Sequence, residues 1–125
     1  MIEIKHNENI NPKELGLFFI ENVDETYISF GDIYTCGRAT EDLKWVPNLE
    51  EVIASEINDI ISGKILNKEV IAAYKDGTLA GFAIIGFNNS IATLEDIVIK
   101  NSLRQKGIGK SFYKEIENSL KTKGI

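Results

Sequence analysis

The sequence is poor in the residues that build metal sites, disulfide frameworks and membrane spans. Its 125 residues include one cysteine, one histidine, two prolines and one tryptophan. A single cysteine cannot form an internal disulfide, and one cysteine with one histidine does not supply the ligands of a zinc site. No apolar run approaches the ~20 residues that a membrane helix needs, and the N-terminus carries no hydrophobic signal stretch. We therefore expect a reducing, cytoplasmic location, with no bound metal ion and no membrane partner.

The chain also lacks an excess of positive charge, but its charges are unevenly distributed. Its 14 basic and 19 acidic side chains give a net charge of −5, which disfavours nonspecific binding of nucleic acid. Residues 100–125 carry a net charge of +5, whereas residues 1–99 carry −10. A charge run is often only a solvated helix face. The alternative is an anion site in the C-terminal quarter, beside an acidic body that attracts cations.

Length and hydrophobic content predict one domain that spans residues 1–125. Hydrophobic residues make up 43% of the chain, which is enough for a core. Apolar periodicity, helix caps and strand-forming runs between turn residues give the order of the elements. We expect strands at 2–5, 69–75, 79–87 and 91–99, helices from Pro12, from Pro47 to Gly63 and from Gly107 to Lys123, and a long loop or short helix at 24–46. The order β-α-α-β-β-β-α predicts an α+β fold.

One segment between the last predicted strand and the last predicted helix combines glycines with basic residues. It reads Arg104-Gln105-Lys106-Gly107-Ile108-Gly109-Lys110-Ser111. A helix N-terminus leaves backbone N–H groups unpaired and carries partial positive charge. Glycines let a phosphate approach those groups closely, and the basic side chains add full charges. The segment therefore indicates an anion site. The alternative is a glycine-containing loop with solvated lysines.

Two nucleotide-binding motifs do not fit this segment. Gly109-Lys110-Ser111 matches the end of a P-loop, but that motif needs a glycine at position 104, which is arginine here. A dinucleotide fingerprint needs a glycine at position 112, which is phenylalanine here. A phosphate or nucleotide binder that uses the same helix end remains the weaker alternative.

The same residues resemble another signature. Arg104-x-x-Gly107-x-Gly109 matches the acetyl-CoA signature [RQ]-x-x-G-x-[GA] of the GNAT N-acetyltransferase superfamily. The run from Leu94 to Ile99 is similar to the fourth strand of that family. The order of the preceding elements also agrees. The resemblance implies a GNAT-like three-layer fold with a mixed, mainly antiparallel sheet flanked by helices, without the usual C-terminal strands.

The resemblance further implies that acetyl-CoA is the co-substrate and that an amine is the acceptor. The backbone of the fourth strand would pair with the pantetheine arm beside a β-bulge, and the amides of the following loop would hold the pyrophosphate. The implied cofactor-binding residues are Ile97, Val98 and Ile99 on the strand, and Arg104, Gln105, Lys106, Gly107, Ile108, Gly109, Lys110 and Ser111 after it.

Acetyl transfer needs a base, because only a neutral amine attacks the thioester. Glu95 lies on the strand where several family members, including the spermidine/spermine N-acetyltransferases, have a candidate base. Its neighbour Asp96 is expected on the other face of the sheet unless a bulge intervenes. The alternative for both side chains is a hydrogen-bonded or exposed carboxylate at a sheet edge.

In the family a fifth strand follows the last helix, and it separates from the fourth strand to form the cofactor cleft. In the family, the tyrosine that usually acts as the acid for the departing thiolate lies beyond that point. Tyr113 is not expected to replace it. A second copy of the chain could complete the sheet, because the fourth strand otherwise has an open edge. The alternative function is a catalytically inactive CoA-binding or regulatory module. The sequence does not identify the acceptor.

Aromatic and acidic residues of the 24–46 stretch are candidates for the acceptor site. Tyr27, Tyr34 and Trp45 could shape a pocket or stack on a cationic amine, although ordinary packing is the simpler interpretation. Asp24, Glu25, Asp32, Glu41 and Asp42 could form an acidic rim for an amine, or equally a charged surface that keeps the protein in solution. We expect structural roles for His6 and Cys36.

Overall fold

The chain divides into two compact units. The computed structural model describes residues 2–103 and 108–122. One unit comprises residues 1–10 and 59–125 and holds the sheet; we call it the sheet unit. The other comprises residues 11–58 and is called the helical unit.

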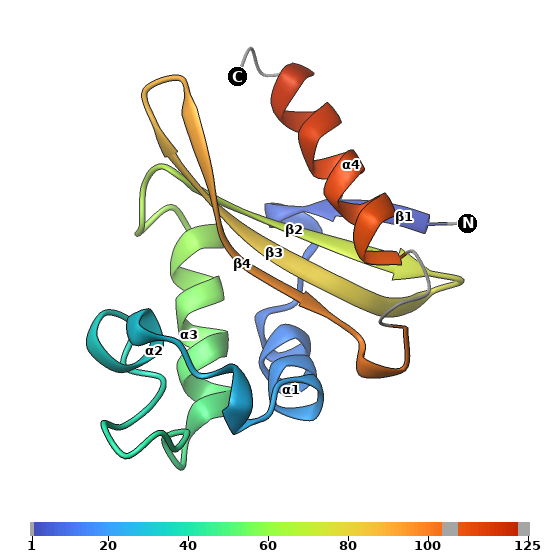
Figure 1. Ribbon diagram of the computed structural model, residues 1–125. Coiled ribbons are helices and arrows are strands. Elements are labelled where there is room, and N and C mark those ends of the chain that lie inside the picture. Colours follow the sequence, from blue (N-terminus) through green and yellow to red (C-terminus); the bar gives the residue numbers. More distant parts are fainter. Residues whose placement is uncertain (1, 104–107, 123–125) are drawn as a thin grey trace. The chain divides into compact units, whose positions relative to one another are not determined.

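Four antiparallel strands form the sheet in the order β1-β2-β3-β4. Figure 1 shows β4 at one edge of this sheet and α4 across one of its faces. The strands and their bounds are β1 (Ile2–His6), β2 (Lys68–Lys75), β3 (Thr78–Asn88) and β4 (Ile91–Ile99). All four predicted strands and the α+β class are confirmed.

Local turn chemistry explains why β2, β3 and β4 follow one another in the sheet. Asp76 and Gly77 both have positive φ, as a tight hairpin between antiparallel strands requires. Asn89 also has positive φ in the turn that joins β3 to β4. Asparagine, aspartate and glycine adopt this conformation more readily than other residues. The hairpin signals read from the sequence are therefore confirmed.

Helix α4 (Ile108–Thr122) provides one side of the core of the sheet unit. Its Phe112 and Ile116 are buried against Ile71 and Ile85 of the sheet. Leu120 packs at the margin of the same cluster. The four-residue spacing of these apolar side chains places them on one helix face, and the helix itself was predicted from Gly107 to Lys123.

The helical unit contains α1 (Pro12–Asn22), α2 (Phe30–Tyr34) and most of α3 (Leu49–Ile61). α1 begins at Pro12 as predicted, and Asn11 caps it, because the Asn11 side chain accepts a hydrogen bond from the Lys13 backbone N–H at 3.0 Å. Gly16 lets α1 approach α3, since a Cβ there would lie 2.5 Å from the backbone oxygen of Glu50. No helix among the described residues is long and apolar enough to cross a membrane.

The stretch 24–46, which has no clear periodicity, is organised around a buried arginine. The guanidinium of Arg38 donates hydrogen bonds to Glu56 of α3 and to Asp32 of α2. Asp32 also accepts from Ser29 in a capping box that begins α2. Asp32 is therefore part of the interior of the helical unit, and the expectation that it lines an acidic rim is wrong.

Candidate active site

A β-bulge in β4 gives Glu95 an unusual position. Ile85 of β3 pairs with Leu94 and Ile84 pairs with Asp96, so that Glu95 is the extra residue between two regular pairs. A bulge re-aims the side chain of the extra residue and bends the strand. The bulge expected beside the predicted cofactor-binding segment is thus present, and Glu95 lies in it.

The Glu95 carboxylate lies over a glycine of the neighbouring strand. A Cβ on Gly86 of β3 would lie 2.2 Å from Oε2 of Glu95, so only glycine leaves room for the carboxylate at this place. Across the sheet, Nζ of Lys68 on β2 donates to Oε1 of Glu95 at 2.7 Å. Lys68 pairs with Gly86 in the register of β2 and β3. Three strands therefore contribute to the setting of one carboxylate.

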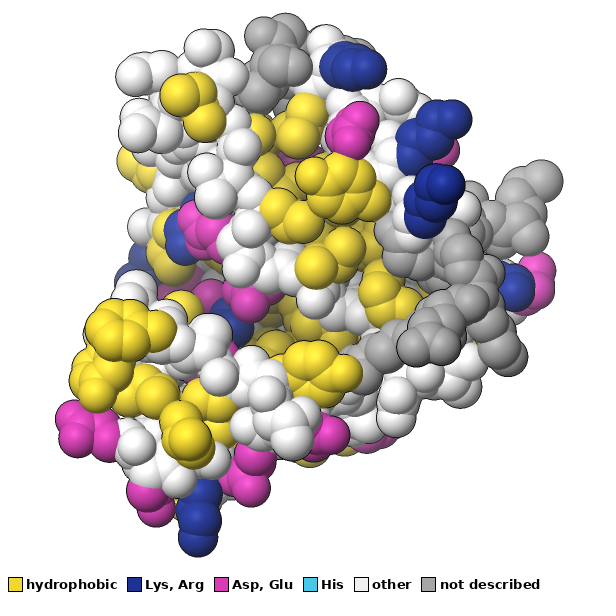
Figure 2. All heavy atoms as spheres, in the orientation of Figure 1, with side chains coloured by type: hydrophobic (Ala, Val, Ile, Leu, Met, Phe, Trp, Pro, Cys, Tyr) yellow, Lys and Arg dark blue, Asp and Glu magenta, His cyan; other side chains and the backbone are white. Residues whose placement is uncertain are grey.

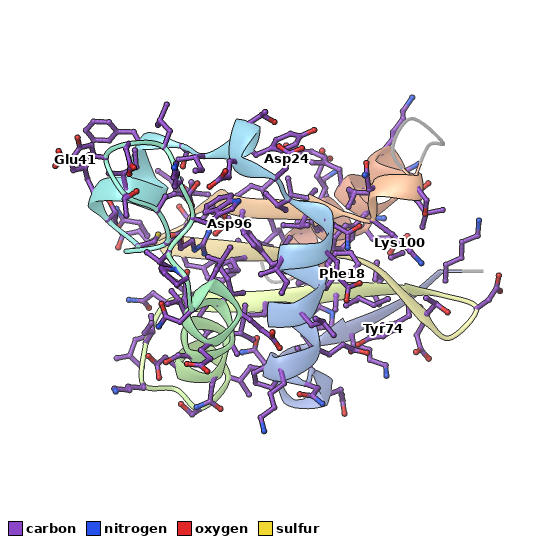
Figure 3. The ribbon with its side chains drawn as sticks, turned by 90° about the horizontal axis from the view of Figure 1, so that it is seen from below. Phe18, Asp24, Glu41, Tyr74, Asp96 and Lys100 are labelled. Atoms are coloured by element: carbon purple, nitrogen blue, oxygen red, sulfur yellow. The ribbon has the colours of Figure 1, made fainter. Side chains whose placement is uncertain are left out.

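Asp96 shares this face of the sheet. It pairs with Ile84, which lies two residues from Gly86 on β3 and so points to the same side. The bulge is the reason that two consecutive residues, Glu95 and Asp96, point the same way. Figure 3 shows Asp96 on β4 and Lys100 just beyond the end of that strand.

The C-terminal half of β4 presents main-chain groups at the edge of the sheet. The backbone N–H of Lys100 bonds to the carbonyl of Ala80 at 2.8 Å. In an antiparallel pair such bonds alternate along the strand, so Val98 also faces β3 while Ile97 and Ile99 direct their N–H and C=O groups outward. Val98 is buried, whereas Ile97 is 40% exposed.

Gly81 of β3 keeps this part of β4 close to the core. A Cβ on Gly81 would lie 2.7 Å from the carbonyl oxygen of Val98 and 3.0 Å from Cδ1 of Ile99. Phe112 of α4 lies 3.5 Å from the same point. The position of the edge relative to β3 and α4 therefore depends on a residue without a side chain.

The predicted pyrophosphate loop falls largely outside the described residues. Arg104, Gln105, Lys106 and Gly107 are among the residues that are not described, and α4 begins at Ile108. Gly109, Lys110 and Ser111 follow in its first turn, where Lys110 and Ser111 are exposed. The assignment of a pyrophosphate to this loop stays a prediction.

An apolar hollow lies between β4 and α4 on the face that α4 covers. Figure 2 shows hydrophobic side chains gathered over these two elements, with basic side chains beside them. The hollow is lined by Ile85, Ala92, Leu94, Tyr113, Ile116, Glu117 and Leu120. Ile91, at the start of β4, is 66% exposed.

The aromatic candidates of the helical unit separate into packed and exposed residues. Trp45 packs edge-on against Phe19 with ring centroids 5.5 Å apart, which agrees with an ordinary packing role. Tyr27 and Tyr34 are both more than half exposed, so neither belongs to a core. Cys36 is exposed, and the described residues include no group of three metal-ligating side chains.

Sequence reasoning missed Lys68 and Gly86. A glycine inside a strand often marks a bulge or a close approach of another group, so Gly86 carried a signal that could have been used. No pattern in the sequence around Lys68 indicated its role, because its contact with Glu95 depends on the pairing of three strands.

A bulged fourth strand that is last in the order of the described strands, followed in the sequence by a basic segment and then by a helix, agrees with one family of enzymes. Residues 39–125 match the model of the acetyltransferase (GNAT) family. The match covers more than half of the chain, and the chain belongs to this family. A search of curated protein sequences gave no match.

Solved structures of acetyltransferases share the fold. All of the chain aligns with the ribosomal-protein-S18-alanine N-acetyltransferase from Escherichia coli, at 18% identity and a TM-score of 0.58, and spans 63% of that protein. It aligns over its full length with the PaiA N-acetyltransferase from Thermoplasma acidophilum in complex with coenzyme A, at 23% identity, a TM-score of 0.56 and 75% of that chain. A GNAT acetyltransferase from Streptococcus pneumoniae matches at 20% identity and a TM-score of 0.61, over all of this chain and 70% of that one. At these identities the likeness establishes the fold.

Proposed function

We propose that this chain is an N-acetyltransferase that moves the acetyl group of acetyl-CoA to a primary amine of a small molecule or protein by direct attack, with Glu95 as the base. The observation that carries the proposal is the placement of the Glu95 carboxylate. A bulge turns it across the sheet, and Gly86 leaves it the room. The bulge and the glycine therefore both act on the same ionisable group, the Glu95 carboxylate, in an acetyltransferase fold.

The chemistry required of Glu95 is the removal of a proton. Alkyl amines are mostly protonated at neutral pH, with an ordinary pKa of about 10.4 for a lysine side chain, and the protonated form cannot attack. A carboxylate can accept that proton, either directly or through one water molecule. Glu95 is about one-third exposed on its side chain, so an amine from solution can reach it.

The edge of β4 fits a cofactor arm that contains amide groups. The N–H and C=O groups that Ile97 directs outward can pair with such amides in the way that one strand pairs with another. The basic segment that follows in the sequence, with Arg104, Lys106 and Lys110, would supply positive charge for a pyrophosphate. Bound acetyl-CoA would supply a thioester as the acetyl donor.

The first test is calorimetric titration with acetyl-CoA of the native chain and of the Gly107→Trp variant. We expect a bulky indole at position 107 to keep the pyrophosphate away from the backbone, so binding by the native chain should disappear in the variant. A Gly31→Ala variant is the matched control, because a Cβ there meets nothing closer than Ser29 Oγ at 3.8 Å. Unchanged affinity of the Gly107→Trp variant would overturn the loop assignment.

The second test separates an enzyme from a binding module. An amine panel containing alkyl diamines, lysine amide and a peptide with a free N-terminus is incubated with acetyl-CoA, and thiol release is followed. Transfer that falls about 10²-fold or more in Glu95→Gln, at unchanged acetyl-CoA affinity, supports the base. Binding of acetyl-CoA without transfer to any amine would instead identify a catalytically inactive CoA-binding or regulatory module.

We also propose a homodimer in which a second copy extends the sheet at β4. Among the described strands, β4 is at the edge and has an apolar hollow beside it. An edge strand with apolar neighbours readily pairs with another strand. The bulge at Glu95 leaves residues 91–94 for such pairing and residues 97–99 for the cofactor.

A further inference from the structure

We propose that Lys68 occupies the position of the acceptor amine and that the acceptor must displace it from Glu95 before transfer. This inference rests on the proposed function of Glu95. It makes Lys68 a specificity-determining residue, which tunes the affinity for cationic amines without taking part in the transfer.

The geometry of the contact is that of a bound substrate amine. Nζ of Lys68 lies 2.7 Å from Oε1 of Glu95, a hydrogen-bonding distance. Lys68 reaches this place from β2, across the width of β3, and passes the glycine that leaves room for the carboxylate. A lysine ammonium is itself a primary amine on an unbranched alkyl chain. Lys68 and the acceptor are therefore the same chemical group competing for the same carboxylate.

Lys68 is also able to leave. The side chains of Lys68 and Glu95 are 31% and 34% exposed, so water can solvate both charges when they separate. The flexible four-carbon stem of lysine lets its ammonium move into solvent without a change in the backbone. When the acceptor binds, the ion pair between Lys68 and Glu95 is replaced by one between the acceptor and Glu95. Because the Lys68–Glu95 pair must first be broken, it raises the apparent KM for amines.

The test compares Lys68→Met with Lys68→Arg. Methionine removes the competing charge and the donor at similar length, so KM for the best amine of the panel should fall about two- to fivefold, the ratio that corresponds to a partly exposed ion pair. The kcat value should change less than that ratio. Arginine can hold a carboxylate by two parallel hydrogen bonds, so KM should rise in Lys68→Arg.

The control is Lys75→Met, which removes an exposed lysine from the other end of β2. If general electrostatic repulsion of cationic amines were the cause, this variant would lower KM as much as Lys68→Met. An equal fall in both variants overturns the proposal. A loss of kcat in Lys68→Met also overturns it, because that result would make Lys68 a support for the base.

A second readout does not depend on turnover. The ε-methylene resonance of Lys68 is assigned in lysine-labelled protein from its loss in Lys68→Met, and n-butylammonium chloride is added. Displacement should move this resonance toward that of exposed Lys75, whereas sodium chloride at equal ionic strength should move it less. A resonance that responds equally to both salts overturns the proposal. Absence of transfer to the whole panel, with normal displacement of Lys68, would overturn the proposed function alone.

Discussion

The guanidinium of Arg38 holds the carboxylate of Glu56 by two hydrogen bonds, from Nε at 3.1 Å and from Nη2 at 2.8 Å. Arg38 is 2% exposed, and Nη1 bonds to Asp32 as well. The ring of Phe19 lies 5.5 Å from the guanidinium carbon. One buried cation therefore ties the irregular 24–46 stretch to α1 and α3 inside the helical unit.

Removal of the Glu56 carboxylate should destabilise the protein strongly. In Glu56→Ala the Arg38 guanidinium keeps its charge in a buried place but loses two hydrogen bonds. Removing one partner of a buried ion pair costs about 3–5 kcal/mol of unfolding free energy, and the remaining bond to Asp32 and the partial exposure of Glu56 place the expected loss near the lower value. Urea unfolding followed by circular dichroism measures it.

Asn58→Ala, an exposed substitution on the same helix, serves as the control and should change the unfolding free energy by less than about 0.5 kcal/mol. A loss below about 1 kcal/mol in Glu56→Ala would show that Arg38 is not the centre of this network.

The strands and their turns were predictable because their signals are local. Apolar runs bounded by Asp76-Gly77 and by Asn89 predict hairpins from neighbouring residues alone. Asn11 likewise caps the helix that directly follows it. The role of Arg38 was not predictable, because Arg38 lies in a stretch without periodicity and its partners are 6 and 18 residues away. A basic residue in such a stretch is usually a surface residue.

The candidate site was predictable only in part for the same reason. The strand that carries Glu95 and the segment 97–99 follow from the sequence, and the family resemblance gives them a role. The bulge that aims Glu95 depends on the register between β3 and β4, which a single strand does not encode. The ion pair with Lys68 depends further on β2, 27 residues earlier.

Gly86→Ala should lower the proposed acetyltransferase activity while leaving the fold and the proposed cofactor site intact. The new Cβ would meet Oε2 of Glu95, the end of a flexible side chain, so the carboxylate must rotate away while the backbone stays in place. We expect kcat/KM for the amine to fall at least about tenfold, with acetyl-CoA affinity and melting temperature nearly unchanged. Steady-state kinetics with calorimetry measure both.

Full activity of Gly86→Ala would show that the position of the Glu95 carboxylate over β3 does not matter for transfer. Gly31→Ala should behave as the native chain in both measurements, because the added methyl group meets only Ser29 Oγ, at 3.8 Å.

Gly81→Ala, in the same strand, should instead lower the stability of the protein and its affinity for acetyl-CoA. Its Cβ would lie 2.7 Å from the Val98 carbonyl, which belongs to the backbone and cannot swing aside. The clash should destabilise the protein by about 1–3 kcal/mol, as overpacking commonly does, and should weaken acetyl-CoA binding by shifting the edge at Ile97 and Ile99. Thermal unfolding and calorimetry test this. Unchanged acetyl-CoA affinity in a destabilised variant would argue against the β4 edge as the cofactor contact.

Asp42 should show a pH-dependent contribution to stability that depends on Thr40. The Thr40 hydroxyl donates to the Asp42 carboxylate, and this bond, followed by the backbone N–H of Asp42 and by Lys44, lowers the pKa of Asp42 below its ordinary value of 3.8. A pKa lowered by folding means that the contribution is complete above pH 3.8 and is lost as the pH falls through the native value. NMR titration of Asp42 should therefore give a higher pKa in Thr40→Val. An identical pKa in both proteins would exclude the hydroxyl as the cause.

Self-association through β4 should be sensitive to one exposed side chain. Ile91 begins β4 and is 66% exposed, so Ile91→Lys should leave the fold unchanged and place a positive charge at the edge where a second copy would pair. Charged residues, lysine in particular, prevent edge-to-edge pairing of strands. The native chain should sediment as a dimer at micromolar concentration, and the variant as a monomer.

Leu43→Lys is the control, because Leu43 is also an exposed apolar residue but lies outside the sheet, and this variant should remain a dimer. A monomeric native chain would leave the edge of β4 to the cofactor alone, and a dimer that tolerates Ile91→Lys would require another interface.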